Sequence, residues 1–292
     1  MNDIFTEARV AYLAYLNEGG VEPLVDMGSF RSQAESYLPR SSQLGLCPLA
    51  YANEKRGVEP SHPELLTKNQ PNLLHLFRSG NQCAREWTQT MVWYAKYNPS
   101  WKIQIEVPCD DEWTTGTIDM VLTTSDTKYV IDWKRTDQTA ITERATGRVH
   151  GYQNFLQVAD YCRKMKNLYP HYDIVGVVLR DYRSFWRPFW MISQADHWSI
   201  VVNDKEVDIV RTNELYNVRG EAQVYILDTL LHHPPYKHPL EWWQCAQKVK
   251  GTVYKARCPY WGSCWKLPQE VDFANGVYNE EGEFYGLETP TA

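Results

Sequence analysis

The sequence lacks the features that mark membrane-spanning, secreted and repetitive proteins. No apolar run approaches the roughly twenty residues that a helix needs to cross a bilayer. The first residues, Met1-Asn2-Asp3, lead into a charged amphipathic stretch rather than a signal peptide. No Gly/Ser linker, internal repeat or heptad pattern is present. We therefore expect a protein without membrane contacts that folds as a single elaborated domain over residues 1–268.

Cysteine is present, but in an odd number. An odd count without an export signal argues against a disulfide framework and for a reducing cytoplasm. Cys83, Cys109 and Cys162 fall on predicted helices or strands, and we expect them to be small core residues. The seven cysteines are Cys47, Cys83, Cys109, Cys162, Cys245, Cys258 and Cys264.

An excess of positive charge is also missing, since the formal net charge is −6. The last stretch, residues 269–292, holds six of the 36 acids and no lysine or arginine, so the remaining 30 acids balance the 30 basic residues. We expect a flexible acidic tail and a neutral body, which would bind nucleic acid through local basic patches. A locally basic stretch, which we expect to follow the phosphates of a nucleic acid, carries Arg135, Arg144, Arg148 and Arg163.

Two apolar, β-branched runs that each carry an aspartate are the most informative feature that is present. Asp119 lies in the first run, and Asp132 ends the second, where Trp133 and Lys134 follow it. The polar turn residues 123–127 separate the runs and predict a hairpin. Two converging carboxylates suit Mg²⁺ or Mn²⁺ rather than zinc, and a lysine beside them favours metal-assisted phosphodiester cleavage. The alternative is an edge hairpin with solvated charges.

A helical pattern follows this hairpin in the sequence. Apolar residues recur at helical spacing between Val149 and Met165. Gln157 and Tyr161 are four residues apart and therefore share one face of the predicted helix. Taken alone, this pair is typical of an amphipathic helix with a half-buried tyrosine.

Three motifs follow one another in the sequence: a G-x-x-D strand at residues 116–119, a D-x-K triplet at 132–134 and the Q-x-x-x-Y pair at 157–161. In this order they resemble the RecB-like branch of the PD-(D/E)XK nuclease superfamily. The resemblance implies a restriction-endonuclease-like α/β core. It implies that Asp119 and Asp132 ligate a divalent metal, with the Trp133 carbonyl as a further ligand. Lys134 would position the attacking water or help to deprotonate it. Gln157 and Tyr161 would orient the DNA strand or support Lys134.

The same resemblance implies an upstream helix that supplies an acid or a histidine to the metal. The matching segment is Phe77 to Trp87. Many relatives carry histidine at the position that Ala84 occupies here, so the chain departs from the pattern, and Glu86 is the nearest replacement ligand.

The cysteines near the two ends are similar to those of iron–sulfur members of this branch, which include CRISPR adaptation nucleases and AddB-type helicase–nucleases. Those proteins carry one cysteine before the core and three after it, ending in C-x-x-C-x5-C. The resemblance implies a [4Fe–4S] cluster that ties the ends of the chain across the core. Lys255 stands where the pattern needs a cysteine, so the implied ligands are Cys47, Cys245, Cys258 and Cys264. Structural zinc on the same thiolates and free buried cysteines are the alternatives.

Periodicity predicts strands flanked by helices, an α/β core with a mixed central sheet at about residues 72–203. A helical N-terminal part and a cysteine-containing C-terminal part elaborate this core. Helices are expected at Ile4–Asn17, Asn72–Phe77, Gly80–Tyr97, about Val149–Met165 and within Lys205–Thr229. Strands are expected at Lys102–Val107, Thr115–Leu122, Lys128–Asp132, Tyr172–Arg180, Ser184–Ile192 and Ser199–Asn203.

The sequence therefore predicts a Mg²⁺- or Mn²⁺-dependent deoxyribonuclease, expected to act as an exonuclease on single strands or duplex ends. General similarity suggests a phage or mobile-element protein, with a helicase or recombinase as a candidate partner. A phage protein of this kind would act in the cytoplasm of the host. The alternative is a noncatalytic nucleic-acid-binding or scaffold protein on a decayed nuclease fold. The absent histidine and the broken C-x-x-C motif favour this alternative. The evidence against it is the complete set of Asp119, Asp132, Lys134, Gln157 and Tyr161. A third possibility is a zinc-dependent regulator that uses the C-terminal cysteines.

Overall fold

A computed structural model describes residues 4–27, 38, 40–43, 47–66, 69–136, 152–182, 185–194, 197–202, 205–208, 245–272, 277–278 and 284–285. The chain divides into two compact units. The first contains Met1–Gly45 and Leu76–Glu221, and the second contains Leu46–His75 and Ala222–Ala292. No linker composition marks this division, because one boundary falls inside a continuous helix, α3 (Pro71–Ala95).

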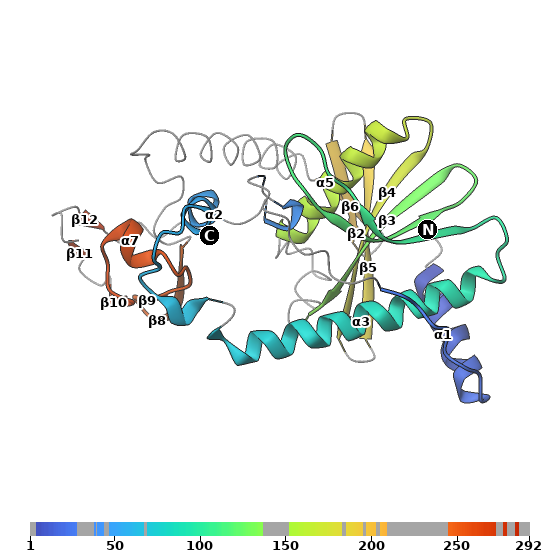
Figure 1. The fold of residues 1–292 in the computed structure, drawn as a ribbon, viewed down its shortest axis with the longest axis horizontal. Helices are drawn as coiled ribbons and strands as arrows, with labels where there is room; N and C mark the ends of the chain where they lie inside the picture. Colours follow the sequence, from blue (N-terminus) through green and yellow to red (C-terminus); the bar gives the residue numbers. More distant parts are fainter. Residues whose placement is uncertain are drawn as a thin grey trace. The chain divides into compact units, whose positions relative to one another are not determined.

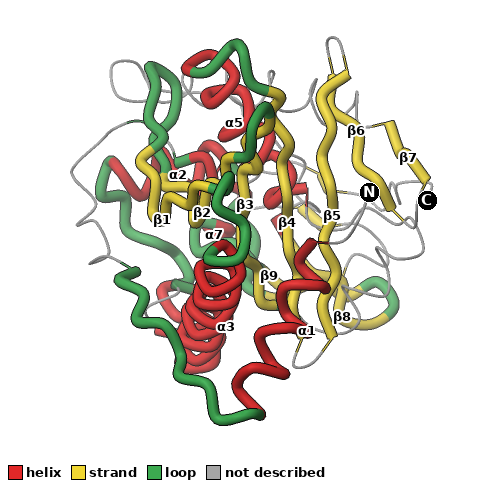
Figure 2. The backbone as a smooth tube through the Cα atoms, turned by 90° about the vertical axis from the view of Figure 1, so that its right-hand side faces the viewer, coloured by secondary structure: helices red, strands yellow, loops and turns green. Residues whose placement is uncertain are grey.

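The first unit is built on a seven-stranded mixed sheet in which the strands lie in sequence order, β1 to β7 (Figure 2). All neighbouring strands are antiparallel except β3 and β4, which run parallel. A parallel pair needs a crossover connection, and helix α5 (Tyr152–Leu168) lies between these two strands in the sequence. The strands are β1 (Lys102–Pro108), β2 (Thr117–Thr123), β3 (Thr127–Arg135), β4 (Asp173–Tyr182), β5 (Phe185–Gln194), β6 (His197–Val202) and β7 (Lys205–Asp208).

Helices cover both faces of this sheet (Figures 1 and 2). Successive side chains of a strand point to opposite faces, so β3 contributes to two cores. Val130 joins the core under α5, whereas Ile131 and Trp133 join the core under α3 and α1 (Ile4–Asn17). The predicted α/β class, with a mixed sheet flanked by helices, is confirmed.

The helices follow their apolar spacing. In α1, Phe5, Ala8 and Tyr12 are buried, and in α3 the buried residues at four-residue intervals are Cys83, Trp87 and Met91. The bounds of α1 agree with the prediction. The prediction of two helices around Gly80 is wrong, because α3 runs through this glycine, whose cost of about 1 kcal/mol inside a helix is too small to end it.

The predicted strands and buried cysteines are present, whereas part of one predicted helical segment is a strand. The six predicted strands are present with small shifts of their ends. An additional strand, β7, occupies the first residues of the segment within which a helix was expected, and residues 209–229 lie outside the described part of the chain. Cys83, Cys109 and Cys162 are buried in the cores, as predicted. No helix among the described residues combines the length and apolar character needed to span a membrane.

The second unit has its own small core and sheet. Helix α2 (Pro48–Lys55) and the 3₁₀ turn η2 (Pro63–Leu65) come from its first segment. Its second segment supplies a three-stranded sheet of order β10-β9-β8 and the short helix α7 (Trp261–Trp265). Strand β10 lies within the stretch expected as an acidic tail, where it pairs with β9. The strands are β8 (Ala246–Lys250), β9 (Val253–Ala256), β10 (Glu270–Asp272) and a separate pair, β11 (Val277–Tyr278) and β12 (Phe284–Tyr285).

Candidate functional site

The predicted hairpin is present, and its two strands stop pairing next to the aspartates. The β2–β3 ladder reaches Met120 and Ile131 and goes no further in this direction. Beyond it, the Trp133 backbone N–H donates to Asp119 Oδ2 at 2.8 Å. The Asp119 carboxylate therefore takes the place of a backbone acceptor, which fixes it at the end of β3.

Asp132 is the most buried acid of this group, with 1% of its surface exposed. Its Oδ1 accepts hydrogen bonds from Lys134 Nζ at 2.9 Å and from Gln157 Nε2 at 3.1 Å. Its Oδ2 lies 2.8 Å from Lys134 Nζ, but the direction is poor for a hydrogen bond, so this buried oxygen accepts none. Asp132 and Lys134 are two apart on β3 and thus share the face under α5.

Helix α5 brings Gln157 and Tyr161 to the same place. The Gln157 amide donates one hydrogen bond to Asp132 and another to Tyr161 Oη, both at 3.1 Å. An amide NH₂ group has two donors, so both are used. The structure thus brings together all five predicted residues, Asp119, Asp132, Lys134, Gln157 and Tyr161. In this arrangement Gln157 is hydrogen-bonded to Asp132.

Burial and mutual repulsion dominate the electrostatics of the two acids. Burial, followed by the charge of Asp132, raises the pKa of Asp119 to about 7. Burial also raises the pKa of Asp132, although Lys134 and Arg180 act in the opposite direction. Burial lowers the pKa of Lys134, but the two carboxylates and the hydrogen bond to Asp132 together raise it above its ordinary value. Two acids that disfavour each other's charge gain from a nearby cation.

The donor set fits a hard divalent cation. Among the described residues, no group of three or more His, Cys, Asp and Glu side chains is placed to hold a metal ion. Mg²⁺, however, is commonly bound through one or two carboxylates, with water and substrate phosphate as its other ligands. Asp119 and Asp132 supply that number, and the buried Asp132 Oδ2 has an acceptor site left for a cation.

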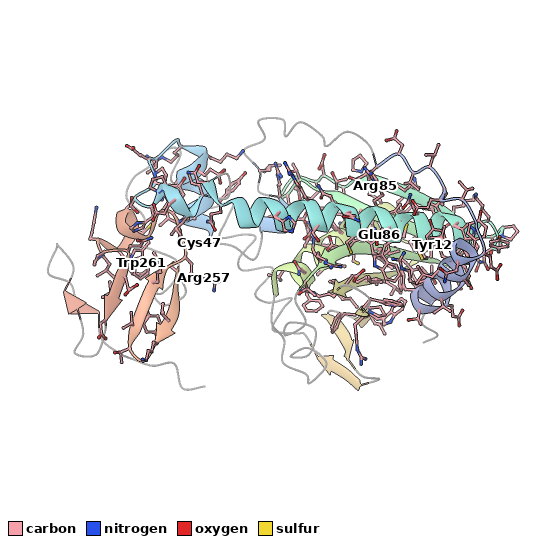
Figure 3. All side chains as sticks on the ribbon, turned by 90° about the horizontal axis from the view of Figure 1, so that it is seen from below. Tyr12, Cys47, Arg85, Glu86, Arg257 and Trp261 are labelled. Carbon is pink, nitrogen blue, oxygen red and sulfur yellow. The ribbon has the colours of Figure 1, made fainter. Side chains whose placement is uncertain are left out.

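The structure does not bring Glu86 to the two aspartates. Glu86 lies on α3, which covers the opposite face of the sheet (Figure 3), and its carboxylate pairs with Arg9 of α1 at 3.3 Å. The Trp133 carbonyl remains a predicted ligand, because no contact of that oxygen tests it.

The predicted DNA-binding arginines are separated. Arg135 pairs with the buried Asp181 at 3.2 Å. Arg163 pairs with Asp111 and with the buried Asp160. Each of these two charges is thus partly neutralised. The other two, Arg144 and Arg148, lie outside the described residues.

Sequence reasoning missed a buried polar network on α5 next to the site. Asp160 accepts from Ser41 Oγ at 2.5 Å and from Thr114 Oγ1 at 2.6 Å. Lys164 lies 3.1 Å from the same carboxylate and also donates to the backbone carbonyls of Cys109 and Thr114. The four-residue spacing of Asp160 and Lys164 on a predicted helix was the available signal.

The four predicted cluster cysteines lie together in the second unit. Cys47 is the residue before α2, and Cys245 precedes β8. Cys258 lies three residues before α7, and Cys264 lies within α7. All four line one small hollow, together with Trp261 (Figure 3 labels Cys47 and Trp261). None of the seven cysteines, all of which the structure describes, forms a disulfide.

Burial favours the neutral form of three of the thiols that line this hollow, Cys245, Cys258 and Cys264. Burial raises the pKa of Cys258 to about 11 and that of Cys264 to about 12. A hydrogen bond with Cys47 and then burial raise the pKa of Cys245. An iron–sulfur cluster takes its thiolates at the corners of a larger body, so it needs four thiols around a small volume.

Neither a protein-family model nor a curated protein matches this chain.

Proposed function

We propose that the protein is a divalent-metal-dependent nuclease of the restriction-endonuclease-like kind, which hydrolyses phosphodiesters in DNA. The observation that carries the proposal is the set of contacts of Asp132, which joins Lys134 on its own strand to Gln157 on α5 beside a second acid, Asp119. The element order, with a hairpin carrying both acids followed by the Gln/Tyr helix, supports it further. An exonuclease acting on single strands or duplex ends is the form that we expect.

Each residue has a role that its contacts support. Asp119 and Asp132 would hold Mg²⁺ or Mn²⁺, which when bound supplies Lewis-acid chemistry to the phosphate and the attacking water. Lys134 places a positive charge at the same point, where it stabilises negative charge that develops on the phosphoryl oxygens. Gln157 orients the Asp132 carboxylate, and Tyr161 in turn fixes the Gln157 amide by accepting its second hydrogen bond.

The test is digestion of end-labelled single-stranded DNA in Mn²⁺ by the full chain and by Asp132→Asn protein. Loss of a metal ligand should reduce cleavage by at least about a thousandfold, which corresponds to roughly 4 kcal/mol of transition-state stabilisation. Asp173→Asn is the matched control, because Asp173 is an exposed acid at the start of β4 and should leave the rate unchanged.

The outcomes separate the alternatives. Full activity of Asp132→Asn protein would overturn the assignment of the site. Binding of the DNA by wild-type protein without any shortening would favour a noncatalytic scaffold instead. Comparison of free-ended with circular DNA distinguishes exonuclease from endonuclease action.

The second unit would bind a thiolate-ligated group through Cys47, Cys245, Cys258 and Cys264, with a [4Fe–4S] cluster as the first candidate and zinc as the second. The convergence of all four thiols on one hollow supports this. Anaerobic purification followed by metal analysis tests it. Iron with sulfide supports the cluster, zinc alone supports a structural zinc site, and neither metal would overturn both.

A further inference from the structure

We propose that Lys134, Arg180 and Arg187 form a basic row that binds the backbone phosphates of one nucleic-acid strand beside the two aspartates, an inference that rests on the proposed function. The register of three neighbouring strands produces the row. Lys134 of β3 lies opposite Arg180 of β4, and Arg180 lies opposite Arg187 of β5. Residues opposite one another on neighbouring strands share a face of the sheet, so the three positions form a line across it.

The row lies on the face that carries the aspartates. Counting in steps of two along each strand, Arg180 shares a face with Val178, and Arg187 shares a face with Phe189. Both apolar residues belong to the core under α5. Asp132, two residues before Lys134, contacts α5 through Gln157. The basic row therefore begins where the apolar core under α5 ends, next to the site.

Charge balance gives the row a role in binding an anion. Arg180 lies within electrostatic reach of the site, because its charge acts on both Asp132 and Lys134. The positive charges of Lys134 and Arg180 then balance the two carboxylates of Asp119 and Asp132. With Arg187, the three cations of the row exceed these two carboxylates by one charge without any metal, and a bound dication would keep the group positive when Glu106, whose charge acts on Asp119, is ionised. A phosphodiester is the anion that the proposed reaction brings to this point.

The dimensions suit a short stretch of a single strand. Neighbouring strands of a sheet are about 4.8 Å apart, so the row spans roughly 10 Å. At a rise of roughly 3.4 Å per nucleotide, that length corresponds to about three nucleotides. Arg187 is exposed and marks the outer end of the row, while Lys134, whose side chain is 26% exposed, marks the end at the aspartates. Between them, the buried Arg180 donates to Thr136 Oγ1 at 3.1 Å, which holds its guanidinium in place.

The experiment measures binding without cleavage. Fluorescence anisotropy of a fluorescein-labelled thymidine oligonucleotide is followed in EDTA over a series of salt concentrations. Each phosphate contact contributes about 0.7 to the slope of log affinity against log salt for a single strand. Arg187→Gln should therefore reduce the slope by about 0.7 and weaken binding roughly three- to tenfold near 0.1 M salt. Arg85→Gln is the matched control, because Arg85 is an exposed arginine on α3, in the layer over the other face (Figure 3).

A second pair of variants covers the buried member of the row. Arg180→Lys keeps the charge and should keep the slope, whereas Arg180→Gln removes the charge and should lower the slope by less than Arg187→Gln, because Arg180 is buried. An unchanged slope and affinity in Arg187→Gln, or an equal loss in Arg85→Gln, would overturn the row. A uridine oligonucleotide distinguishes the sources of phosphate: a matching loss extends the row to RNA, and a loss confined to thymidine assigns it to DNA. Since binding is measured without metal, a wild-type protein that never cleaves would refute the nuclease and leave the row intact.

Discussion

The two oxygens of Asp132 have different surroundings, and the difference decides what this residue can bind. Oδ1 is oriented by Lys134 and Gln157, whereas Oδ2 is buried without a well-directed hydrogen bond. A buried acceptor without a hydrogen bond costs up to about 1–3 kcal/mol of folding free energy, and the Lys134 ammonium 2.8 Å from Oδ2 offsets part of that cost. A cation that contacts Oδ2 would recover part of that cost, so metal binding and stability should be coupled.

This coupling predicts a metal-dependent melting temperature. At a Mn²⁺ concentration of 100 times the Kd, binding stabilises the folded state by about 2.7 kcal/mol. For a unit of this size each kcal/mol corresponds to roughly 2–4 °C, so we expect a rise of about 5–10 °C. Asp119→Asn should abolish the rise and Asp173→Asn should preserve it, as measured by differential scanning calorimetry. An equal rise in Asp119→Asn protein would show that Mn²⁺ binds elsewhere.

Lys128 illustrates a charged residue with a structural role. Its ammonium group lies 4.4 Å from the ring centre of Tyr169 and 4.6 Å from that of Tyr172, and it donates to Thr123 Oγ1 at 2.9 Å. Burial lowers the pKa of Lys128, but two aromatic faces and a hydroxyl stabilise its charge. These contacts tie the start of β3 to the loop after α5.

Replacing Lys128 should therefore cost stability and spare activity. Lys128→Met keeps most of the apolar stem and removes the cation, with an expected loss of about 1–2 kcal/mol in the free energy of unfolding. Urea denaturation measures this loss. The control is Lys102→Met, which removes an exposed lysine from the edge strand β1 and should change stability by less than about 0.5 kcal/mol. Equal effects of the two substitutions would contradict the role given to the tyrosines.

Helix α5 joins the site to the rest of the first unit through two polar pairs on neighbouring turns. Gln157 donates hydrogen bonds to Asp132 and to Tyr161, and Asp160 and Lys164 bind Ser41 and the β1–β2 connection. Gly116 lies where these two sets meet, and a Cβ there would stand 2.6 Å from Tyr161 Cε1 and 3.0 Å from Ser41 Oγ. The position of α5 therefore depends on a residue without a side chain.

Gly116→Ala should displace Tyr161 and so loosen the Gln157 contact to Asp132. Overpacking of this kind costs about 1–3 kcal/mol, and we expect at least about a tenfold loss of cleavage rate as well. Gly80→Ala is the control, because the nearest atom to its added Cβ is 4.0 Å away on Arg135. Alanine at this helical position should stabilise the protein by about 0.5–1 kcal/mol and leave the rate unchanged. An active Gly116→Ala enzyme would show that Tyr161 is not needed in its present position.

Local patterns predicted the elements well and their long-range pairing only in part. The β-branched runs around Asp119 and Asp132 identified the hairpin, because a short polar turn leaves antiparallel pairing as the compact solution. Arg180 could not be found in this way. Its place beside Lys134 depends on the parallel register of β3 and β4, which the crossover through α5 sets. Asp160 was also missed, since its partner Ser41 is 119 residues away.

The division into two units assigns the two kinds of candidate site to separate cores. Asp119 and Asp132 belong to the first unit, whose sheet is covered on both faces. The four thiols belong to the second, whose core is small and is built around Trp261 and Trp265. A small core gives little stability by itself, and a thiolate-bound metal group is one way in which such units reach a stable fold.

Tryptophan truncation in each core should therefore affect different functions. Trp261 is 1% exposed and lines the thiol hollow, so Trp261→Ala should cost about 3–5 kcal/mol in the second unit and abolish the binding of iron or zinc. Oligonucleotide binding and stabilisation by Mn²⁺ should persist. Trp87 is fully buried under the sheet of the first unit, where its Nε1 donates to Asp181, so Trp87→Ala should give the reverse pattern. The measurements are metal analysis and the Mn²⁺-dependent shift in melting temperature, each made on both variants. If each variant lost both the bound iron or zinc and the Mn²⁺ shift, the two units would fold as one.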